Sequence, residues 1–278
     1  MEKFVSFFMM IAFLISGGNY TDNSTYQCFK KEYKAEEKSH ILQEDFAGID
    51  NKGSGWGFLK KKGEEPEIYK STQELFQEYN TYYLDPKREK KIYLTFDEGY
   101  ENGYTSVILD ILEEENVSAA FFITGPYLEK ETELVDRMVN EGHIVGNHTV
   151  NHPNLHKLAS PQKMADELSG LNSAFFERYG KNMEYMRPPE GEYSPRVLAV
   201  ANSLGYKTIF WSFAYKDWDT KAQKGAQYAF SQVTPYLHNG AILLLHAVSS
   251  DNAGALKDII RYAKEEGYQF ASLDELGG

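Results

Sequence analysis

Two histidines and two carboxylates have residue types and spacing that suit metal binding and hydrolysis. His148 and His152 lie four residues apart in GNHTVNHPN, and Asp97 and Glu98 follow the apolar segment KIYLTF. Pro153 disfavours helical backbone geometry at His152, so we expect the two imidazoles on a strand end and a loop. Two neutral imidazoles and one carboxylate are a recurring ligand set for a catalytic divalent metal with open positions.

Further polar and titratable residues follow other apolar segments. After EYM, KTIFWS and AILLL these residues are Arg187, Pro188, Pro189, Glu190, Asp217, Trp218 and His246. Some have simpler explanations when taken alone: Asp97 and Glu98 can cap the next helix, and His246 can be a core histidine. Together, the carboxylates, histidines and arginine at successive strand ends predict a hydrolase-like active site.

The elements that would position these residues alternate regularly from residue 91 onward. Apolar segments of strand character cover 91–96, 117–124, 143–147, 184–188, 207–212, 241–246 and 268–273. Segments with helical character lie between them, at 105–116, 131–142, 160–180, 194–205, 226–240 and 252–267. This alternation predicts an α/β fold with a parallel sheet. About seven strands with near-continuous apolar runs favour a closed or nearly closed barrel, whose reactive groups lie at the C-terminal strand ends.

Local signals support these boundaries. Ser-Pro pairs at Ser160 and Ser194 predict two helix starts, and Gly180 predicts a helix end. Pro235 is expected to end or kink its helix. No G-x-G-x-x-G turn follows the first of these strands, which argues against a dinucleotide-binding fold.

The first 18 residues predict export. The apolar run from Phe4 to Ile15 is too short to cross a bilayer comfortably, but it suits a signal peptide cleaved after Gly18 or an uncleaved N-terminal anchor. Residues 19–52 are polar and predict a linker or arm, and residues 53–278 form the expected main domain, with an amphipathic segment at 71–85. We therefore expect an extracytoplasmic protein, secreted or attached to the membrane through its N-terminus.

Composition excludes some classes of partner and bond. The formal net charge of −12 argues against nucleic-acid binding, which needs a basic surface. Cys28 is the only cysteine, so the chain forms no internal disulfide.

Five motifs together resemble a known family. TFDEGY, NHTVNHP, RPPEG, the DW that follows FWS, and LLLH are similar in type and order to the motifs of the polysaccharide deacetylases, carbohydrate esterase family 4. This likeness covers about Lys90 to Leu276. IYLTFDEGYENGYT, EGHIVGNH, LLHAVSSDNAGAL and the upstream GWGF further resemble the muramic δ-lactam-forming de-N-acetylases of spore-forming bacteria, which extends the likeness to about Ser54.

The resemblance implies a distorted (β/α) barrel that removes the N-acetyl group of N-acetylmuramic acid in peptidoglycan, leading to muramic δ-lactam in the spore cortex. The resemblance implies that Asp97 is the general base and that Arg187 orients it. It also implies that the backbone N–H of Glu190 holds the oxyanion and that His246 is the general acid. The implied metal ligands are Glu98, His148 and His152, and substrate contacts are expected from Pro188, Pro189, Asp217 and Trp218.

The resemblance also implies a cofactor and a partner. The ligand set suits zinc, although cobalt, manganese or nickel also fit. The expected partner is a glycan strand of peptidoglycan that has lost its stem peptides, and the sequence does not identify a protein partner.

Three positions depart from the family pattern. Glu98 stands where the family usually has Asp, Glu190 where it usually has an aromatic residue, and Ala214 where many members carry an Asp beside the acid histidine. Asp217 is a candidate to replace that last group by its proximity in sequence.

The alternatives to this function are a deacetylase of another polymer, such as N-acetylglucosamine chains or acetylated xylan, a sugar-binding module with a decayed metal site, or a spore-wall assembly factor.

Overall fold

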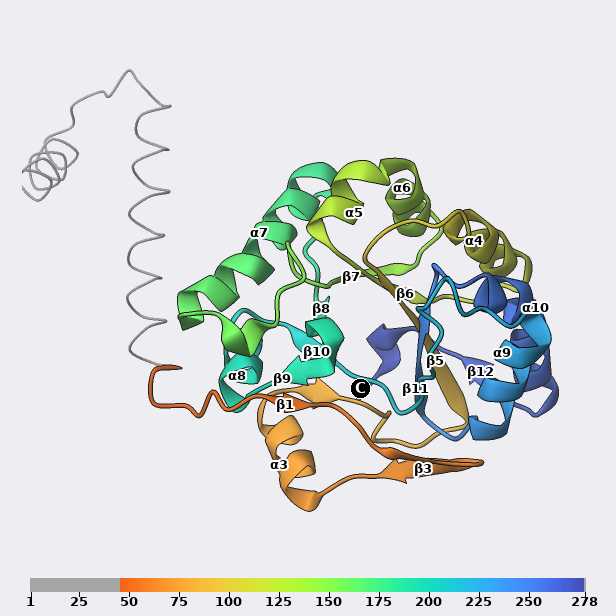
Figure 1. Ribbon diagram of the computed structural model, residues 1–278, viewed down its shortest axis with the longest axis horizontal. Helices are drawn as coiled ribbons and strands as arrows, with labels where there is room; N and C mark the ends of the chain where they lie inside the picture. The colour runs from red at the N-terminus through yellow and green to blue at the C-terminus, as the bar shows by residue number, and fades with distance from the viewer. Residues whose placement is uncertain (1–45, 278) are drawn as a thin grey trace, which may run out of the picture. The chain divides into compact units, whose positions relative to one another are not determined.

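The computed structural model describes residues 46–277, which are built around one curled parallel sheet (Figure 1). Along this sheet the strand order is β11 (Ala241–His246), β5 (Lys91–Glu98), β6 (Ala120–Ile123), β7 (Ile144–Asn147), β8 (Tyr185–Met186), β10 (Lys207–Ile209) and β4 (Thr81–Tyr82). A short strand, β12 (Gln269–Phe270), pairs with the beginning of β5. These pairings are parallel, so the predicted α/β fold with a distorted barrel of about seven parallel strands is confirmed.

The sheet is strongly curled, and its two edges meet only through single-residue bridges. Leu84, just after β4, bridges Ala241 in β11, and Phe213 bridges Leu243. The segment that follows β10 lies along β11, where Phe213 accepts a backbone hydrogen bond from Leu244 at 2.9 Å. The architecture is therefore a half-barrel, and the chain after β10 lies along its open side.

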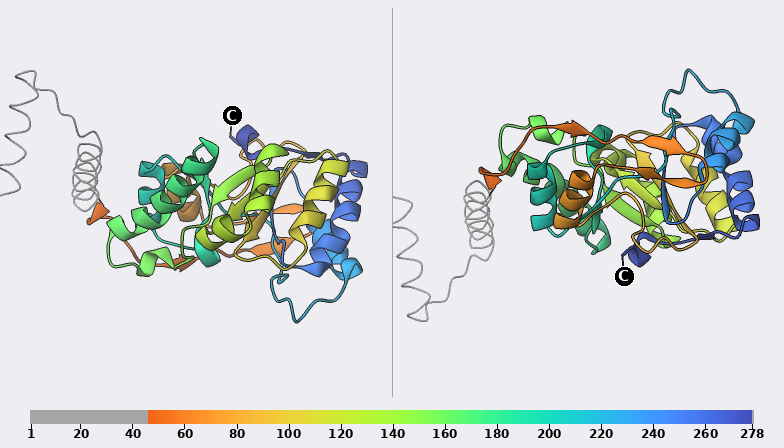
Figure 2. Two further views of the ribbon diagram at one scale, coloured as in Figure 1. Left: turned by 90° about the horizontal axis from the view of Figure 1, so that it is seen from above. Right: turned by 90° about the horizontal axis from the view of Figure 1, so that it is seen from below.

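Helices cover the outside of this sheet (Figures 1 and 2). They are α4 (Thr105–Glu114), α5 (Gly125–Lys130), α6 (Thr132–Asn140), α7 (Pro161–Tyr179), α8 (Pro195–Ser203), α9 (Ala226–Val233) and α10 (Ser250–Glu265). Ser160 and Ser194 cap α7 and α8 as predicted, with hydroxyls that accept from backbone N–H groups. The expected effect of Pro235 is also seen, because α9 ends at Val233 and a 3₁₀ turn, η3 (Thr234–Tyr236), follows. Helix α5 was not predicted.

The part of the chain before β5 differs from the expectation of one amphipathic segment. Helix α3 (Lys70–Glu78) ends early, Asn80 takes a positive φ of 49°, and Thr81–Tyr82 joins the sheet as β4. Upstream, β1 (Ser54–Gly55) pairs with β9 (Glu192–Tyr193), and β2 (Leu59–Lys61) pairs with β3 (Glu64–Glu67).

The expected N-terminal signal, residues 1–18, and most of the expected polar arm lie outside the described residues. The last residues of that arm contact the domain, because the Arg196 guanidinium donates to the carbonyl oxygens of Ala47 and Ile49 at 3.0 and 2.7 Å. No helix within residues 46–277 combines the length and apolar character that a membrane crossing requires.

The register of β5 decides which side chains enter the barrel. Successive residues of a strand face opposite sides. Tyr93 packs in the inner cluster with Phe122 and Ile242, and Asp97 lines a cavity at the C-terminal rim. Tyr93, Thr95 and Asp97 alternate with their neighbours and therefore face the inside of the barrel, so Asp97 lies in its mouth. Glu98, the next residue, lies on the opposite face of the strand.

Candidate active site

A cavity of about 580 Å³ opens at the C-terminal rim of the half-barrel. Its lining comes from β5 and β11 and from the segments that follow β7, β8 and β10: Asp97, His148, His152, Glu190, Gly191, Trp211, Ala214, Tyr215, Trp218, Leu244 and His246. A neighbouring hollow of about 540 Å³ shares Asp97, both imidazoles, Trp218 and His246, and adds Tyr100 and Asn151 among others. The two hollows form one cleft around the predicted reactive groups.

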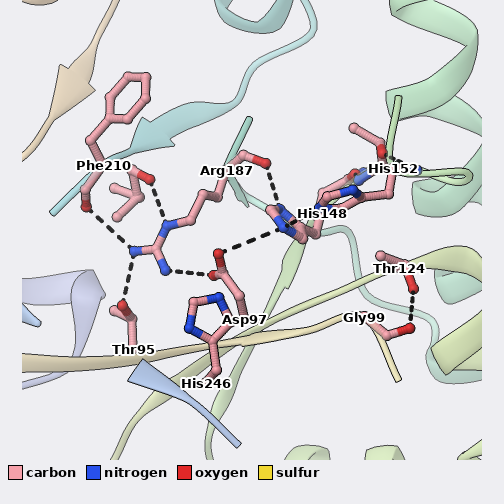
Figure 3. Close-up of polar contacts among 12 residues, drawn as sticks. Thr95, Asp97, Gly99, Thr124, His148, His152, Arg187, Phe210 and His246 are labelled. Carbon is pink, nitrogen blue, oxygen red and sulfur yellow. Dashed lines mark hydrogen bonds and ion pairs between the residues drawn. The ribbon is translucent and has the colours of Figure 1, made fainter. Parts of the chain in front are cut away.

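The two imidazoles converge, as Figure 3 shows. His148 Nδ1 lies 2.8 Å from the carbonyl oxygen of Arg187. That oxygen can only accept, so Nδ1 carries the proton and Nε2 presents a lone pair to the cavity. Nε2 of His152 lies 3.2 Å from Nε2 of His148. Two nitrogen ligands of one tetrahedral cation, each about 2.0–2.1 Å from it, stand about 3.3 Å apart, so this pair fits a shared divalent metal.

Burial keeps His148 in the form that binds metals. Burial lowers its pKa to about 4, against the opposing effect of Asp97, whose Oδ2 lies 3.6 Å from Nε2. The imidazole is therefore neutral at pH 7. A neutral ring with Nδ1 fixed by a backbone carbonyl is the usual state of a histidine ligand.

A tight loop replaces the helix that a four-residue spacing would suggest. Thr149 and His152 have positive φ values of 70° and 55°, and the backbone N–H of His152 donates to Thr149 Oγ1 at 2.9 Å. Left-handed backbone at residues other than glycine costs free energy and concentrates at functional sites. This loop confirms that the pair lies on a strand end and a loop.

Glu98 is directed away from the imidazoles. It is completely buried, its Oε1 accepts from Thr105 Oγ1 at 3.4 Å, and its Oε2 has no partner among the described residues. Burial, reinforced by Glu101 and Asp97, raises the pKa of Glu98 well above its usual range. Within residues 46–277, no group of three or more His, Cys, Asp or Glu side chains is arranged to hold a metal. The structure thus brings together two of the three predicted ligands and not the third.

This arrangement leads to a prediction about metal binding. Replacing His148 or His152 with alanine is expected to weaken Zn²⁺ binding about 100-fold or more, because one of the two converging imidazole nitrogens is lost. Glu98→Gln is expected to leave the affinity within about threefold, since that carboxyl faces Thr105. Titration calorimetry of the whole chain with Zn²⁺ measures both. An equal loss of affinity in Glu98→Gln would place Glu98 among the ligands.

Asp97 is held by a fully buried arginine. Arg187 Nη1 donates to Asp97 Oδ1 at 2.7 Å, and Nη2 donates to Thr95 Oγ1 at 2.8 Å. Nε donates to the carbonyl oxygen of Ile209 at 2.9 Å, and the guanidinium lies 4.2 Å from the ring centroid of Phe122. These contacts fix the orientation of the guanidinium and, through it, one oxygen of Asp97 (Figure 3).

The charge of Arg187 keeps Asp97 ionised. Burial raises the pKa of Asp97, but the charge and hydrogen bond of Arg187 outweigh burial, so the pKa lies below its usual value. Oδ1 is occupied by Arg187, and Oδ2 faces the imidazole side of the cavity. An ionised carboxylate with one free oxygen can take a proton from a water molecule bound there.

His246, the last residue of β11, is held by Asp217. Its Nδ1 lies 2.8 Å from Asp217 Oδ1, and its backbone N–H donates to Asp217 Oδ2 at 2.8 Å. Asn252 Nδ2 donates to the same Oδ2 at 2.6 Å. Burial lowers the pKa of His246, but Asp217 outweighs burial and the net shift is upward. The raised pKa favours a protonated imidazole, which suits proton donation near neutral pH.

Asp217 was expected to contact substrate, but the structure places it behind His246, outside the cavity. Its side chain is completely buried behind His246, and it does not line the cavity. It supplies the carboxylate that the family often has at position 214, although it comes from three residues further along the chain. Trp218, the next residue, is 53% exposed and lines both hollows, where it can stack on a sugar.

The RPPEG motif shapes one wall. Pro188 and Pro189 are buried and outside the cavity lining, so the structure gives them a backbone role in the turn. Glu190 is exposed, lines the cavity and has a positive φ of 59°. This turn places Glu190 in the same cavity lining as the two imidazoles. Gly191 packs so closely on Trp211 that a Cβ there would lie 2.7 Å from the indole.

Several site residues were not predicted. Trp211, Tyr215 and Leu244 line the cavity, and Asn252 supports Asp217. Asn252 lies in the segment LLHAVSSDNAGAL that carried the resemblance, so a signal for it was present. The lining residues belong to the irregular chain after β10 or to the interior of β11, where sequence pattern does not tell which side chains face a cavity.

The curled parallel half-barrel and its rim of two imidazoles, an arginine-held aspartate and an aspartate-held histidine define a hydrolase of carbohydrate-deacetylase type. The polysaccharide deacetylase family model matches residues 85–209. A peptidoglycan-N-acetylmuramic acid deacetylase of Bacillus subtilis, PdaA, is 43% identical over 230 residues, 82% of this chain and 87% of that protein. The chain belongs to the polysaccharide deacetylases, carbohydrate esterase family 4.

Solved structures agree. The structure of Bacillus subtilis PdaA, described as a family 4 carbohydrate esterase, matches with a TM-score of 0.79 and 43% identity, covering 82% of this chain and 98% of that one. A family 4 carbohydrate esterase from Bacillus anthracis matches with a TM-score of 0.70 and 40% identity, covering 82% of this chain and 98% of that one.

Proposed function

We propose that this protein is a metal-dependent peptidoglycan de-N-acetylase that removes the acetyl group of N-acetylmuramic acid and so leads to muramic δ-lactam in the spore cortex. The observation that carries this proposal is the pairing of an ionised Asp97 with a protonatable His246 across one cavity that also holds two converging imidazoles. The 43% identity to a protein named for N-acetylmuramic acid supports the sugar.

The proton transfers follow from the two pKa directions. Asp97, whose pKa is lowered, takes a proton from the attacking water through its free Oδ2. His246, whose pKa is raised, gives a proton to the departing amine, which would otherwise be a poor leaving group. Arg187 holds Asp97 in place, and Asp217 holds His246 in place.

His148 and His152 are the proposed metal ligands. A divalent metal held there would lower the pKa of a bound water and polarise the amide carbonyl. We propose zinc, although cobalt, manganese and nickel also fit the ligands. The backbone N–H of Glu190 is proposed to donate to the developing oxyanion. Trp218 is proposed to stack on the sugar.

Lactam formation adds a condition on the substrate. In a δ-lactam the freed amine is joined by an amide bond to the lactyl carboxyl of the same sugar, whose C–O bond breaks to release water, so that carboxyl must carry no stem peptide. We therefore propose glycan strands without stem peptides as the substrate. Such strands lie outside the cytoplasm, so the proposal includes export and action at the cell envelope or the cortex side of the membrane.

Acetate release from peptide-stripped peptidoglycan tests this function. The wild-type chain with Zn²⁺ is expected to release acetate and to produce muramic lactam or free muramic amine detectable by mass spectrometry. The chelated protein is expected to be inactive, and re-addition of the metal is expected to restore activity. Acetate from N-acetylglucosamine oligomers alone, with none from the stripped glycan, would instead indicate a deacetylase of another polymer.

A further inference from the structure

An irregular segment carries Trp218 into the cleft. Residues 214–225, which lead to α9, belong to no helix or strand. The Trp218 side chain lines both hollows although the residue is 53% exposed, and the ammonium of Lys216 lies 4.9 Å from its ring centroid. A ring this exposed has few packing contacts to fix it. Its position over the cleft therefore depends on the backbone on either side of it.

Carboxylates anchor this backbone before and after the tryptophan. The side chain of Asp217 accepts from the backbone N–H of His246 at 2.8 Å. Asp251, in the first turn of α10, accepts at 2.6 and 2.8 Å from the two backbone N–H groups that precede α9. Among the described residues, the hydrogen bonds that join 218–222 to another element pass through one side chain, that of Gln223.

The Gln223 amide connects this segment with the start of α10. Its Nε2 donates to the carbonyl oxygens of Asp217 and Asp219, both at 2.9 Å. These two residues flank Trp218. Its Oε1 accepts from the backbone N–H of Asp251 at 3.1 Å and from the N-cap hydroxyl of α10 at 2.7 Å. The carbonyls can only accept and the backbone N–H can only donate, so the amide can face only one way.

Holding both carbonyls fixes the backbone on both sides of Trp218. A mobile segment would have to be ordered when a sugar binds, which costs conformational entropy, whereas a segment already held has lost that entropy on folding. We propose that Gln223 is a positioning residue that holds the Trp218 ring over the cleft, so that the ring is in place before the substrate arrives. This inference rests on the proposed function, in which Trp218 stacks on the sugar.

Gln223→Ala tests this role through KM and kcat. The variant is expected to raise KM for the peptide-stripped glycan about tenfold and to leave kcat within about twofold, because the tryptophan contacts the sugar and not the reacting amide. The pH profile of kcat/KM is expected to keep its shape, since Asp217 still holds His246. A matching fall in kcat, or an alkaline limb moved to lower pH, would mean that Gln223 acts through Asp217 and would overturn the assignment.

Two further variants separate the hydrogen bonds of Gln223 from its bulk and from general effects on the segment. Gln223→Met keeps the length of the side chain without its donors, so it is expected to raise KM as Gln223→Ala does. A wild-type KM in Gln223→Met would contradict the proposal. Lys221→Ala is the matched control, because the backbone N–H of Lys221, and not its side chain, donates to Asp219. Its KM is expected to stay unchanged.

A double-mutant cycle shows whether Gln223 acts through Trp218. Titration calorimetry of the peptide-stripped glycan with the Asp97→Asn protein requires no turnover. In that protein, Gln223→Ala and Trp218→Ala are each expected to weaken binding about tenfold, and both changes together are expected to weaken it no more than Trp218→Ala alone. Additive effects, no effect of either change, or absence of binding would overturn the inference. Failure of the wild-type chain to release acetate, with the cycle as expected, would count against the proposed function alone.

Discussion

Replacing Asp97 with asparagine is expected to lower kcat/KM for acetate release about 10²- to 10⁴-fold. An amide cannot take the proton that Oδ2 is proposed to accept, whereas its oxygen can still accept the hydrogen bond from Arg187 Nη1, which is 2.7 Å long in the present structure. The side-chain volume is retained, so the cavity keeps its shape. Initial rates on peptide-stripped glycan at saturating Zn²⁺ measure the change.

The control for this variant is Asp219→Asn. Asp219 is a loop aspartate that pairs with the exposed Lys216 and does not line the cavity, so its loss is expected to leave kcat/KM within about twofold. Thermal unfolding and Zn²⁺ affinity of Asp97→Asn separate lost chemistry from lost folding. An Asp97→Asn protein that retains more than about a tenth of the activity would exclude Asp97 as the general base.

The strands and most helices were predictable because their signals are local. The apolar run of β5 and the Ser-Pro starts of α7 and α8 depend on neighbours in sequence. Strand β4 could not be predicted, because two residues after a helix carry too little pattern to distinguish a strand from a helix end. Its position next to β10 depends on packing between segments more than 120 residues apart, Thr81 with Thr208 and Tyr82 with Ile209.

In the site, too, the features set by local sequence could be predicted, and those set by packing of distant segments could not. The strand ends place Asp97, His148 and His246 on one rim because parallel strands share a direction. Glu98 was assigned with Asp97 by motif, but the two-residue period of a strand places neighbours on opposite faces. Asp217 was first grouped with substrate contacts. Its real position depends on how the irregular chain after β10 folds back over β11, which no sequence period encodes.

Replacing Asp217 with asparagine is the second change for which we expect a large effect, because Asp217 holds His246 in place. In Asp217→Asn, the side-chain oxygen is expected to stay at the Oδ2 position, because the backbone N–H of His246 and Asn252 Nδ2 both donate there. The amide NH₂ then faces Nδ1 of His246, in place of the Oδ1 that lies 2.8 Å away in the native chain. A donor opposite Nδ1 makes that nitrogen an acceptor and opposes protonation of the ring.

The consequence is a pH profile displaced in a definite direction. Asp217 raises the pKa of His246, so the acid stays protonated to higher pH than a free imidazole would. Without that carboxylate the pKa falls, and the alkaline limb of the kcat/KM profile is expected to move to lower pH, with a rate loss of about 10²–10⁴ at pH 7. The acidic limb, which belongs to Asp97, is expected to stay nearly unchanged, because Arg187 still holds that carboxylate. Asp219→Asn again serves as the control. A normal alkaline limb in Asp217→Asn would mean that the proton reaches the amine from a group other than His246.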